Sequence, residues 1–594
     1  MKKTLSVFLF LCLVSSVFGQ SKPVHKISMA KDDNFPVAAN TQNVNWQTMH
    51  NDFAPVGTVP FPISYNDYWT NGQNVRRILV LGDTVIISTD INPDLTGPPP
   101  AVTTTRSYYQ YSYDGGLTWL NDAISMSPSV ATRWPNMAPI INSGSMTMTI
   151  AVTGHIYNTA QQGVTMVDAI LGLGSFTITS TPAINYMDFF GYQKNATSLG
   201  GIISAPSGSA TDSLFYYNFT YATNTYSGRK MIAPEIQASF RYSMVIADNG
   251  LNVYAAYWRS ALANGLDIGI YNFESTDGGV TWGAGTPVGL PGPIGGDSIS
   301  AWFGMDVIYK PGTTTRCLAF STLAPGSLGT REGSKLLFWS PAVNGGNPTV
   351  ICDYHKIPFM NDTSLFNNNF IGLQVGLTLL SHPSLGYSSD GTKLYCVFSA
   401  VQKDTSRLGG GLINYNYNDI LACISTNNGA TWSNPHSITN TMKRDELYPS
   451  ISKSSNAGTT LNVIYSESGT PGSFTFTDNQ IPDTVYTVFK RIPYFTIGVF
   501  QYSSEIPKEF RLYYNYPNPF NPTTRIRYAL PRAGVVKLAV YDVMGREAET
   551  IVNERQAAGS YEATFDGSRF ASGVYFYRLT AEGFNETRKM ILIR

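Results

Sequence analysis

Residues 112–119 read SYDGGLTW, and the same pattern returns as STDGGVTW at 275–282 and as STNNGATW at 425–432. All three stretches fit S-x-[D/N]-x-G-x-T-W. The Asp or Asn side chain can accept hydrogen bonds from turn amides, the Gly permits a positive φ, and the Trp can pack between neighbouring sheets. Each stretch therefore predicts a hairpin corner with a structural role for its fixed residues: Ser112, Asp114, Gly116, Thr118, Trp119, Ser275, Asp277, Gly279, Thr281, Trp282, Ser425, Asn427, Gly429, Thr431 and Trp432.

Short apolar runs surround these corners. Runs of five to eight β-branched, aromatic or other apolar residues recur at 76–89, 146–154 and 243–258, each bounded by Gly, Asn, Asp or Ser. This spacing is typical of strands, and helical periodicity is not convincing in any long stretch. Segments such as 95–105 and 289–296 are too rich in Gly and Pro for a helix. The sequence predicts an all-β fold.

The three octapeptides resemble the Asp-box of sialidases and related β-propellers. In that family the box lies on a turn between outer strands of a blade, away from the central binding face, so the resemblance implies a fold and no activity. Asp114 and Asp277 are 163 residues apart, and Asp277 and Asn427 are 150 apart. Since a propeller unit takes about 40 to 70 residues, residues 43–495 are expected to form six or seven blades. Separate β-sandwiches would explain the strands equally well, but not the repeated box.

Composition limits the function. The 594 residues include 40 Lys and Arg against 40 Asp and Glu, and only 13% are charged, whereas 13% are aromatic. A chain with no net charge lacks the electrostatic footprint of a nucleic-acid-binding protein. Its 43% of hydrophobic residues suffice for packed cores. We expect a surface of Ser, Thr, Asn, Gly and Tyr, which suits an exported β protein.

Residues 1–19 have the layout of a signal peptide. Lys2 and Lys3 precede an apolar run at 5–14, and Val17 and Gly19 supply the small residues of a cleavage site after Gly19. The run is too short to span a bilayer, and no second long apolar stretch follows. The mature chain is therefore expected to have no transmembrane segment.

Four cysteines remain after the signal peptide: Cys317, Cys352, Cys396 and Cys423. Cys396 and Cys423 fall in consecutive predicted strands, so a disulfide between them is geometrically plausible in an exported chain. The alternative is that they are small buried hydrophobic residues. The sequence leaves both open, as it does the oligomeric state.

The last ninety residues differ from the rest of the chain in their residue pattern. Four prolines at 514–531 precede several short alternating strands, which indicates an Ig-like β-sandwich at 512–594 after a linker and processing region at 496–511. This segment resembles the type A C-terminal sorting domain of the bacterial type IX secretion system. The residues that carry the resemblance are Pro517, Asn518, Pro519, Phe520, Gly545, Gly573 and Tyr575. It implies a partner, the outer-membrane type IX machinery, and export to the cell surface or the medium.

No catalytic set can be assigned. The six His are scattered, and no metal-binding or phosphate-binding motif is present, so no cofactor or metal is expected. Sialidases use three arginines to bind the sialate carboxylate, with a Tyr–Glu nucleophile and an Asp acid. Here only residues 74–79, which contain Arg76 and Arg77, lie near the expected place of the first arginine, and no other triad member can be chosen. The loop aspartates Asp83, Asp90, Asp248 and Asp306 show no pairing either.

We therefore expect a secreted or surface-attached propeller that binds a glycan or protein ligand, and more readily a binding protein than an enzyme. The alternative is a sialidase-like or other glycoside hydrolase. Three converging arginines beside a Tyr–Glu pair would favour the enzyme, whereas a face of Tyr, Asn and Ser would favour binding.

Overall fold

The structure is a computed structural model. It describes residues 57–62, 64, 76–91, 105–120, 122–142, 147–156, 162–182, 190–206, 212–236, 242–259, 269–288, 300–323, 334–357, 379–407, 414–439, 441, 444–453, 456, 460–469, 484–493, 499–503, 507–532, 534–556, 558–567 and 570–593. In these ranges the chain forms strands and two short 3₁₀ turns, and no α-helix. The prediction of an all-β fold is confirmed. The predicted signal peptide at 1–19 lies outside the described residues. No helix in the described ranges has the length and apolarity needed to cross a membrane.

In the described parts of residues 78–493, seven antiparallel sheets follow one another, and in each the strands are neighbours in chain order. The first three sheets contain β1 (Ile78–Leu81), β2 (Thr84–Ile91), β3 (Arg106–Ser112), β4 (Ile124–Ser125); β5 (Thr132–Asn142), β6 (Thr147–Ile156), β7 (Gln162–Asp168), β8 (Phe176–Ser180); and β9 (Phe190–Asn195), β10 (Ser198–Pro206), β11 (Asp212–Thr220), β12 (Thr225–Ile236).

The next four sheets repeat this plan, except that the seventh has three strands. They contain β13 (Tyr242–Ile246), β14 (Val253–Arg259), β15 (Gly269–Ser275), β16 (Thr286–Pro287); β17 (Ser300–Tyr309), β18 (Arg316–Leu323), β19 (Lys335–Trp339), β20 (Thr349–Asp353); β21 (Leu380–Tyr387), β22 (Leu394–Arg407), β23 (Asn414–Ser425), β24 (His436–Ser437); and β25 (Asp445–Ile451), β26 (Thr460–Ser468), β27 (Tyr486–Pro493). The two 3₁₀ turns, η2 (Asn344–Gly346) and η3 (Tyr354–Lys356), flank β20.

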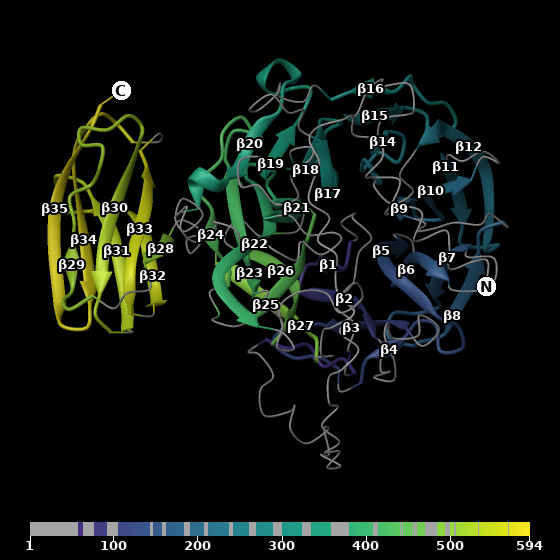
Figure 1. The fold of residues 1–594 in the computed structure, drawn as a ribbon, viewed down its shortest axis with the longest axis horizontal. Helices are drawn as coiled ribbons and strands as arrows, with labels where there is room; N and C mark the ends of the chain where they lie inside the picture. Colours follow the sequence, from purple (N-terminus) through teal and green to yellow (C-terminus); the bar gives the residue numbers. More distant parts are fainter. Residues whose placement is uncertain are drawn as a thin grey trace, which may run out of the picture.

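The seven sheets stand around a common centre (Figure 1). The first strand of each sheet faces that centre and contacts the first strand of the next, from β1 through β5, β9, β13, β17 and β21 to β25. β1 in turn contacts β26, and the amide of Arg77 donates to the Ser450 hydroxyl at 3.3 Å. The sheets thus form a closed, propeller-like ring.

Residues 57–62 and 64 complete the three-stranded seventh sheet. Isolated bridges pair Thr58 with Val488 and Ser64 with Val485, and the Val59 amide donates to the Thr487 carbonyl at 2.9 Å. The beginning of the ring is therefore hydrogen-bonded to its end along the outer edge of β27. This pairing covers a sheet edge that would otherwise be exposed.

Packing between adjacent sheets explains the apolar runs. Every residue of β13, β21 and β25 is buried, because both faces of each sheet are covered by its neighbours. The largest cluster contains Trp134, Tyr216, Tyr254, Phe320 and Trp339, from the second to the fifth sheet. Aromatic side chains of this size fill the widening space between sheets away from the centre.

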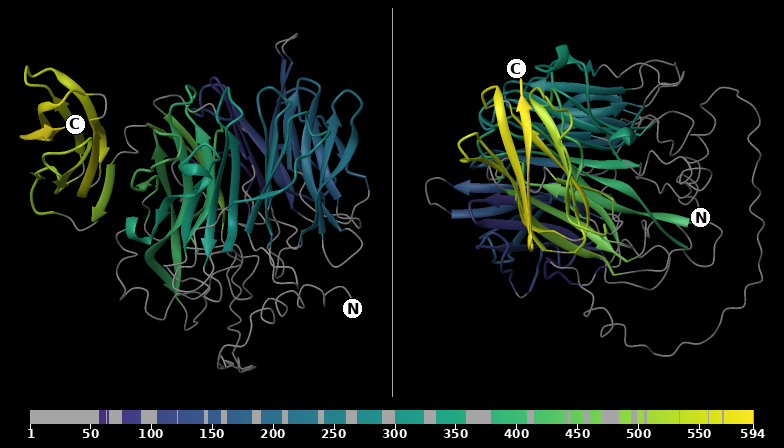
Figure 2. Two further views of the ribbon diagram at one scale, coloured as in Figure 1. Left: turned by 90° about the horizontal axis from the view of Figure 1, so that it is seen from above. Right: turned by 90° about the vertical axis from the view of Figure 1, so that its left-hand side faces the viewer.

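Two further sheets form a sandwich at the C-terminus, beside the rim of the ring (Figure 2). Their strands, in sheet order, are β28 (Val499–Ser503), β33 (Gly559–Asp566), β30 (Thr523–Leu530), β29 (Arg511–Leu512); and β32 (Glu547–Gln556), β31 (Gly534–Tyr541), β34 (Gly573–Ala581), β35 (Phe584–Leu592). One core that includes Ile526, Leu538, Phe565 and Leu579 lies between them.

The sandwich begins earlier in the chain than the sequence predicts. The region 496–511 is expected to be a linker, yet residues 499–503 form β28 and pair with β33, and Arg511 starts β29. Alternation in these two short strands is too brief to be recognised without the partner strands.

Candidate functional site

Four of the inner strands, β5, β17, β21 and β25, share a bulge near their first residues. These inner strands all begin at the same end of the ring, and we call this end the start end. At each bulge one residue has a positive φ: Trp134 (57°), Gly304 (93°), His382 (52°) and Tyr448 (55°). Bulky residues rarely adopt this conformation, so three at equivalent places indicate a feature that the surrounding fold must stabilise.

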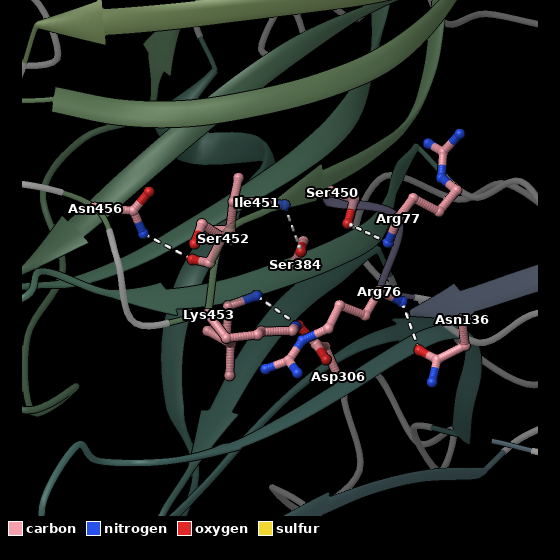
Figure 3. A network of polar contacts seen from close by, with 11 residues as sticks. Arg76, Arg77, Asn136, Asp306, Ser384, Ser450, Ile451, Ser452, Lys453 and Asn456 are labelled. Carbon is pink, nitrogen blue, oxygen red and sulfur yellow. Dashed lines mark hydrogen bonds and ion pairs between the residues drawn. The ribbon is translucent and has the colours of Figure 1, made fainter. Parts of the chain in front are cut away.

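Two positions after each of these positive-φ residues, a polar residue joins adjacent inner strands (Figure 3). Asn136 accepts from the Arg76 amide at 2.8 Å, Ser384 from the Ile451 amide at 3.2 Å, and Ser450 from the Arg77 amide. These bonds satisfy backbone groups that no ladder pairs, and they hold the centre of the ring together.

Asp306 occupies the same position in β17 and accepts from the Leu385 amide at 2.7 Å. Its carboxylate pairs with Lys453, and only 2% of the Asp306 side chain and 9% of the Lys453 side chain are exposed. Burial raises the pKa of Asp306 and lowers the pKa of Lys453, and each partner opposes the shift of the other. The Arg76 guanidinium lies nearby, 4.1 Å from the centre of the Tyr192 ring. The centre thus holds two cations and one carboxylate.

A second charged group lies at the start end. Asp90, near the end of β2, accepts from the Trp134 amide at 2.7 Å and from the Ser107 hydroxyl at 2.9 Å. Burial raises the pKa of Asp90 to about 6, although Arg133 and Arg77 oppose the shift. Burial lowers the pKa of Arg77 to about 9, and its guanidinium donates to the Tyr448 carbonyl. Two guanidiniums therefore face one carboxylate.

Two buried histidines complete this region. Burial, reinforced by Arg77, lowers the pKa of His382 to about 3, and burial with Arg133 lowers that of His155 to about 4. Both imidazoles are therefore neutral at physiological pH. The His382 ring lies 4.7 Å from Tyr448, and the His155 ring 5.4 Å from Trp134. We call the whole set the axial site: Arg77, Asp90, Arg133, Trp134, His155, His382 and Tyr448.

Three carboxyl groups gather beside the axial site, between the sixth and seventh sheets. Glu446 and Glu467 are directly opposite each other on β25 and β26, and Asp419 of β23 is hydrogen-bonded to Glu446. Burial raises the pKa of Glu446, and burial together with Glu446 raises that of Glu467 to about 7. The Arg444 Nε lies 3.6 Å from the Glu467 carboxylate. Such a group can hold a proton at neutral pH.

The shifted pKa of Glu467 predicts a pH-dependent stability. Because its pKa is higher in the folded than in the unfolded chain, the folded state binds the proton more tightly, and this stabilisation is lost as the pH rises through about 7. We expect the free energy of unfolding of the wild type, relative to Glu467→Gln, to fall by about 2 kcal/mol between pH 5 and pH 8.

Urea unfolding across this pH range measures the difference. The buried imidazoles act in the opposite direction below pH 6.5, but they are common to both proteins and cancel in the comparison. Glu509→Gln, at an exposed glutamate, is the matched control and should follow the wild type. A parallel pH profile for Glu467→Gln would show that Glu467 does not titrate in this range.

The three octapeptides lie at the other end of the ring, after β3, β15 and β23. The Asp114 carboxylate accepts from the Ser112 hydroxyl at 2.7 Å and from the amides of Leu117 and Thr118 at 3.0 and 2.9 Å. The Thr118 hydroxyl also donates to this carboxylate, at 2.5 Å. Together these bonds, of which the Thr118 hydroxyl bond contributes most, hold the pKa of Asp114 well below its usual range.

The second and third octapeptides have nearly the same geometry. Asp277 accepts from the Thr281 hydroxyl at 2.6 Å, from the Thr281 amide at 2.9 Å and from Ser275 at 2.8 Å, and these bonds, of which the first contributes most, likewise lower its pKa. Asn427 accepts from Ser425 and from the Thr431 amide, both at 2.9 Å, while its Nδ2 donates to the Thr431 hydroxyl at 2.8 Å. The Asn therefore reverses the direction of one hydrogen bond and keeps the turn.

Each octapeptide also packs against the preceding sheet. The Trp119, Trp282 and Trp432 rings lie 5.4 to 5.5 Å from an aromatic ring of that sheet, in edge-to-face contact. Gly116, Gly279 and Gly429 have positive φ and approach the same rings so closely that an added Cβ would lie within 2.0 to 2.2 Å of them. The aromatic rings belong to Phe489, Tyr216 and Phe338. The octapeptides thus join neighbouring sheets and bring no residue to the axial site.

Sequence reasoning missed most of the axial site. The signal is a short repeat, Trp134-Pro135-Asn136, His382-Pro383-Ser384 and Tyr448-Pro449-Ser450, which marks three of the four bulges. Of the aspartates considered from sequence, Asp90 faces Arg77 and Asp306 pairs with Lys453. Asp248 instead accepts from the Gly312 amide, and Asp83 lies in the turn after β1.

In the sorting segment, the predicted motif holds the last strand in place. The Asn518 side chain accepts from the Ile591 amide at 3.0 Å and donates to the Lys589 carbonyl at 3.3 Å. Phe520 is 1% exposed, and its amide donates to the Ile591 carbonyl at 2.9 Å. Pro517 accepts from the Thr524 hydroxyl, and Pro519 separates Asn518 from Phe520.

The other residues of the motif serve turns and packing. Gly545 has a φ of 77° in the turn between β31 and β32, where an added Cβ would meet no atom within 4 Å. Gly573 begins β34, and the Tyr575 hydroxyl donates to the Ala571 carbonyl at 2.9 Å. Among the described residues, no three His, Cys, Asp or Glu side chains are grouped to hold a metal ion.

Residues 515–593 match the family described as the secretion system C-terminal sorting domain. The resemblance of this segment to a sorting domain is thereby confirmed. None of the curated proteins matches the chain.

Solved structures give only weak similarities. A PL25 ulvan lyase bound to -[GlcA(1-4)Rha3S]- has 10% identity over 73% of this chain and 97% of its own, with a TM-score of 0.42. The NanB sialidase of Streptococcus pneumoniae has 11% identity over 76% of this chain and 72% of its own, with a TM-score of 0.36. An exo-β-1,3-galactanase of Phanerochaete chrysosporium has 10% identity over 89% of this chain and 99% of its own, with a TM-score of 0.30. Similarities at this level identify no shared activity.

Proposed function

We propose that this chain is cargo of the type IX secretion machinery, released from the cell or attached to its surface. The match of residues 515–593 to the sorting-domain family carries this proposal. The structure adds a physical reason for the motif, because Asn518 and Phe520 fasten the terminal strand β35 to the sandwich. A partner that recognises this region would meet an ordered strand.

Deletion of residues 515–593 tests export. In a host with a type IX system, we expect the truncated chain to accumulate in the periplasm and to fall at least tenfold in the surface and medium fractions. Immunoblots of fractionated cells measure this, with the full chain at equal expression as the control. Equal amounts of truncated and full chain outside the cell would refute the proposal.

We further propose that the ring is a seven-bladed propeller whose axial site binds a glycan ligand. The seven sheets, their cyclic contacts and the pairing of residues 57–64 with β27 support seven blades. The site draws residues from the first, second, sixth and seventh sheets, so a ligand there would contact several blades. Aromatic rings suit sugar faces, while guanidiniums and neutral imidazoles suit hydroxyl and acidic groups.

The second candidate is a glycoside hydrolase. Asp90 and Glu467, with pKa values near 6 and 7, favour it because a general acid must hold a proton near neutral pH. Binding is the better supported function, because a sialidase-like site would need three arginines. Among the described residues, Arg77 and Arg133 lie beside Asp90, whereas Arg76 is engaged with Tyr192 and Asp306. The Asp90 carboxylate also accepts hydrogen bonds from the Trp134 amide and the Ser107 hydroxyl.

A glycan array and a panel of fluorogenic glycosides, applied to the purified full chain, test both functions. We expect saturable binding without turnover, weakened at least tenfold by Arg133→Gln and unchanged by Arg229→Gln on the exposed outer strand β12. Hydrolysis of any glycoside that Asp90→Asn abolishes would support the enzyme. If the chain neither binds nor hydrolyses any of these glycans, the glycan proposal is refuted.

A further inference from the structure

Three cysteine side chains share the space between the fifth and sixth sheets. Cys352 of β20, Cys396 of β22 and Cys423 of β23 are fully buried in one apolar cluster, and all are free thiols. Cys396 and Cys423 are directly opposite each other in the ladder, so their side chains point to the same face. Cys352 and Cys423 are hydrogen-bonded across the sheet interface. Cys423 thus has two neighbouring thiols.

The fourth thiol stands apart from this group. Cys317 Sγ lies 3.4 Å from the Tyr387 hydroxyl, which supplies its polar contact in the same cluster. Two links fix the fifth sheet against the sixth: the Thr349 hydroxyl of β20 donates to the Gly429 carbonyl at 2.6 Å, and Phe338 of β19 contacts the Trp432 ring. The position of Cys352 beside Cys423 is therefore set by contacts on both sheets.

Backbone geometry favours one pairing over the other. Residues directly opposite in an antiparallel ladder keep their Cβ atoms about 4.5–5.5 Å apart, whereas a disulfide needs about 3.8 Å. The ladder between β22 and β23 resists that approach, because its paired residues continue without interruption on either side of Cys396 and Cys423. Cys352 reaches Cys423 across a side-chain interface, which can adjust without breaking a ladder.

We propose that Cys352 and Cys423 form a disulfide in the oxidised protein and so join the fifth sheet to the sixth. Two thiols give up two protons and two electrons, one S–S bond forms, and a disulfide oxidant such as oxidised glutathione is reduced to two thiols. The expectation that the cell forms this bond rests on the proposed export, because exported proteins meet an oxidising environment. The pairing itself does not depend on export.

Burial also determines when the bond can form. Burial raises the pKa of the Cys352 and Cys396 thiols, so little thiolate is present at neutral pH in the folded ring. Oxidation therefore occurs while the two sheets are still assembling, and the folded reduced protein reacts slowly. A redox buffer must be present during refolding for the bond to appear.

Refolding of the purified full chain with reduced and oxidised glutathione, followed by alkylation and non-reducing peptide mass spectrometry, tests the pairing. We expect a linked pair of peptides containing Cys352 and Cys423, with Cys317 and Cys396 alkylated after denaturation. A Cys396–Cys423 link, or alkylation of all four thiols, would overturn the proposal. Because the assay needs no secretion, failed export and failed pairing give different results.

Thermal unfolding supplies a second readout. We expect a reductant to lower the Tm of the oxidised wild type by about 5 °C, since the bond closes a loop between residues 71 positions apart. Cys352→Ser should remove this sensitivity, whereas Cys396→Ser, the matched control in the same cluster, should keep it. Sensitivity retained by Cys352→Ser and lost by Cys396→Ser would also overturn the proposal.

Discussion

Lys453→Met is expected to lower the free energy of unfolding by about 3–5 kcal/mol. Lys453 is the ion-pair partner of Asp306, and both side chains are almost completely buried at the centre of the ring. Removal of the ammonium leaves a carboxylate that burial already disfavours and that also accepts from the Leu385 amide. An unpaired buried charge costs far more than an exposed one.

Urea unfolding at pH 7 measures this effect. The double variant Lys453→Met with Asp306→Asn should recover more than half of the loss, because Asn can still accept from the Leu385 amide without a charge. Lys508→Met, at an exposed lysine, is the control and should change the stability by less than about 0.5 kcal/mol. A small effect of Lys453→Met would mean that water or a nearby cation already compensates Asp306.

Gly279→Ala is expected to cost about 3 kcal/mol. Gly279 has a φ of 89°, which costs an L-residue about 1–2 kcal/mol, and the added Cβ would lie 2.1 Å from the Tyr216 ring. Tyr216 is fully buried and touches Trp282, so it cannot move aside without loss of the contact between the third and fourth sheets. Overpacking of this kind adds about 1–3 kcal/mol.

A matched glycine separates the two contributions. Gly312 also has a positive φ, 68°, but an added Cβ there would meet nothing within 4 Å. Gly312→Ala should therefore show only the backbone cost, about 1–2 kcal/mol, by the same unfolding measurement. Equal losses for both variants would contradict the close packing of the octapeptide against Tyr216.

Local patterns made the fold class and the corners predictable. Alternating apolar runs identify strands because the side-chain period of a strand is two. The octapeptides were recognisable because the side-chain hydrogen bonds of their Asp or Asn lie within eight residues, as between Asp114 and Thr118. The sorting segment was recognisable for a similar reason, since its Pro, Asn and Gly residues define turns. None of these signals depends on distant contacts.

The axial site depends on distant contacts and was not predictable. Arg77 and Tyr448 are 371 positions apart in sequence, and they meet only because the ring closes. The pairing of Asp306 with Lys453 likewise joins β17 to the segment after β25. A bulge changes the face of the sheet to which the following side chains point, and the residues before the bulge do not predict that change. The repeat at 134–136, 382–384 and 448–450 can be recognised only when the structure shows that these three segments occupy equivalent places in the inner strands.

The pairing of residues 57–64 with β27 has a consequence for the order of events during synthesis. This early segment belongs to the last sheet, so the ring cannot close until the ribosome has passed Pro493. At about 5–20 residues per second, the segment waits roughly 20 to 90 seconds for its partner strand β27. For that time the backbone groups of the segment lack the partners that β27 later supplies, and a chaperone that shields them would prevent premature pairing with another chain.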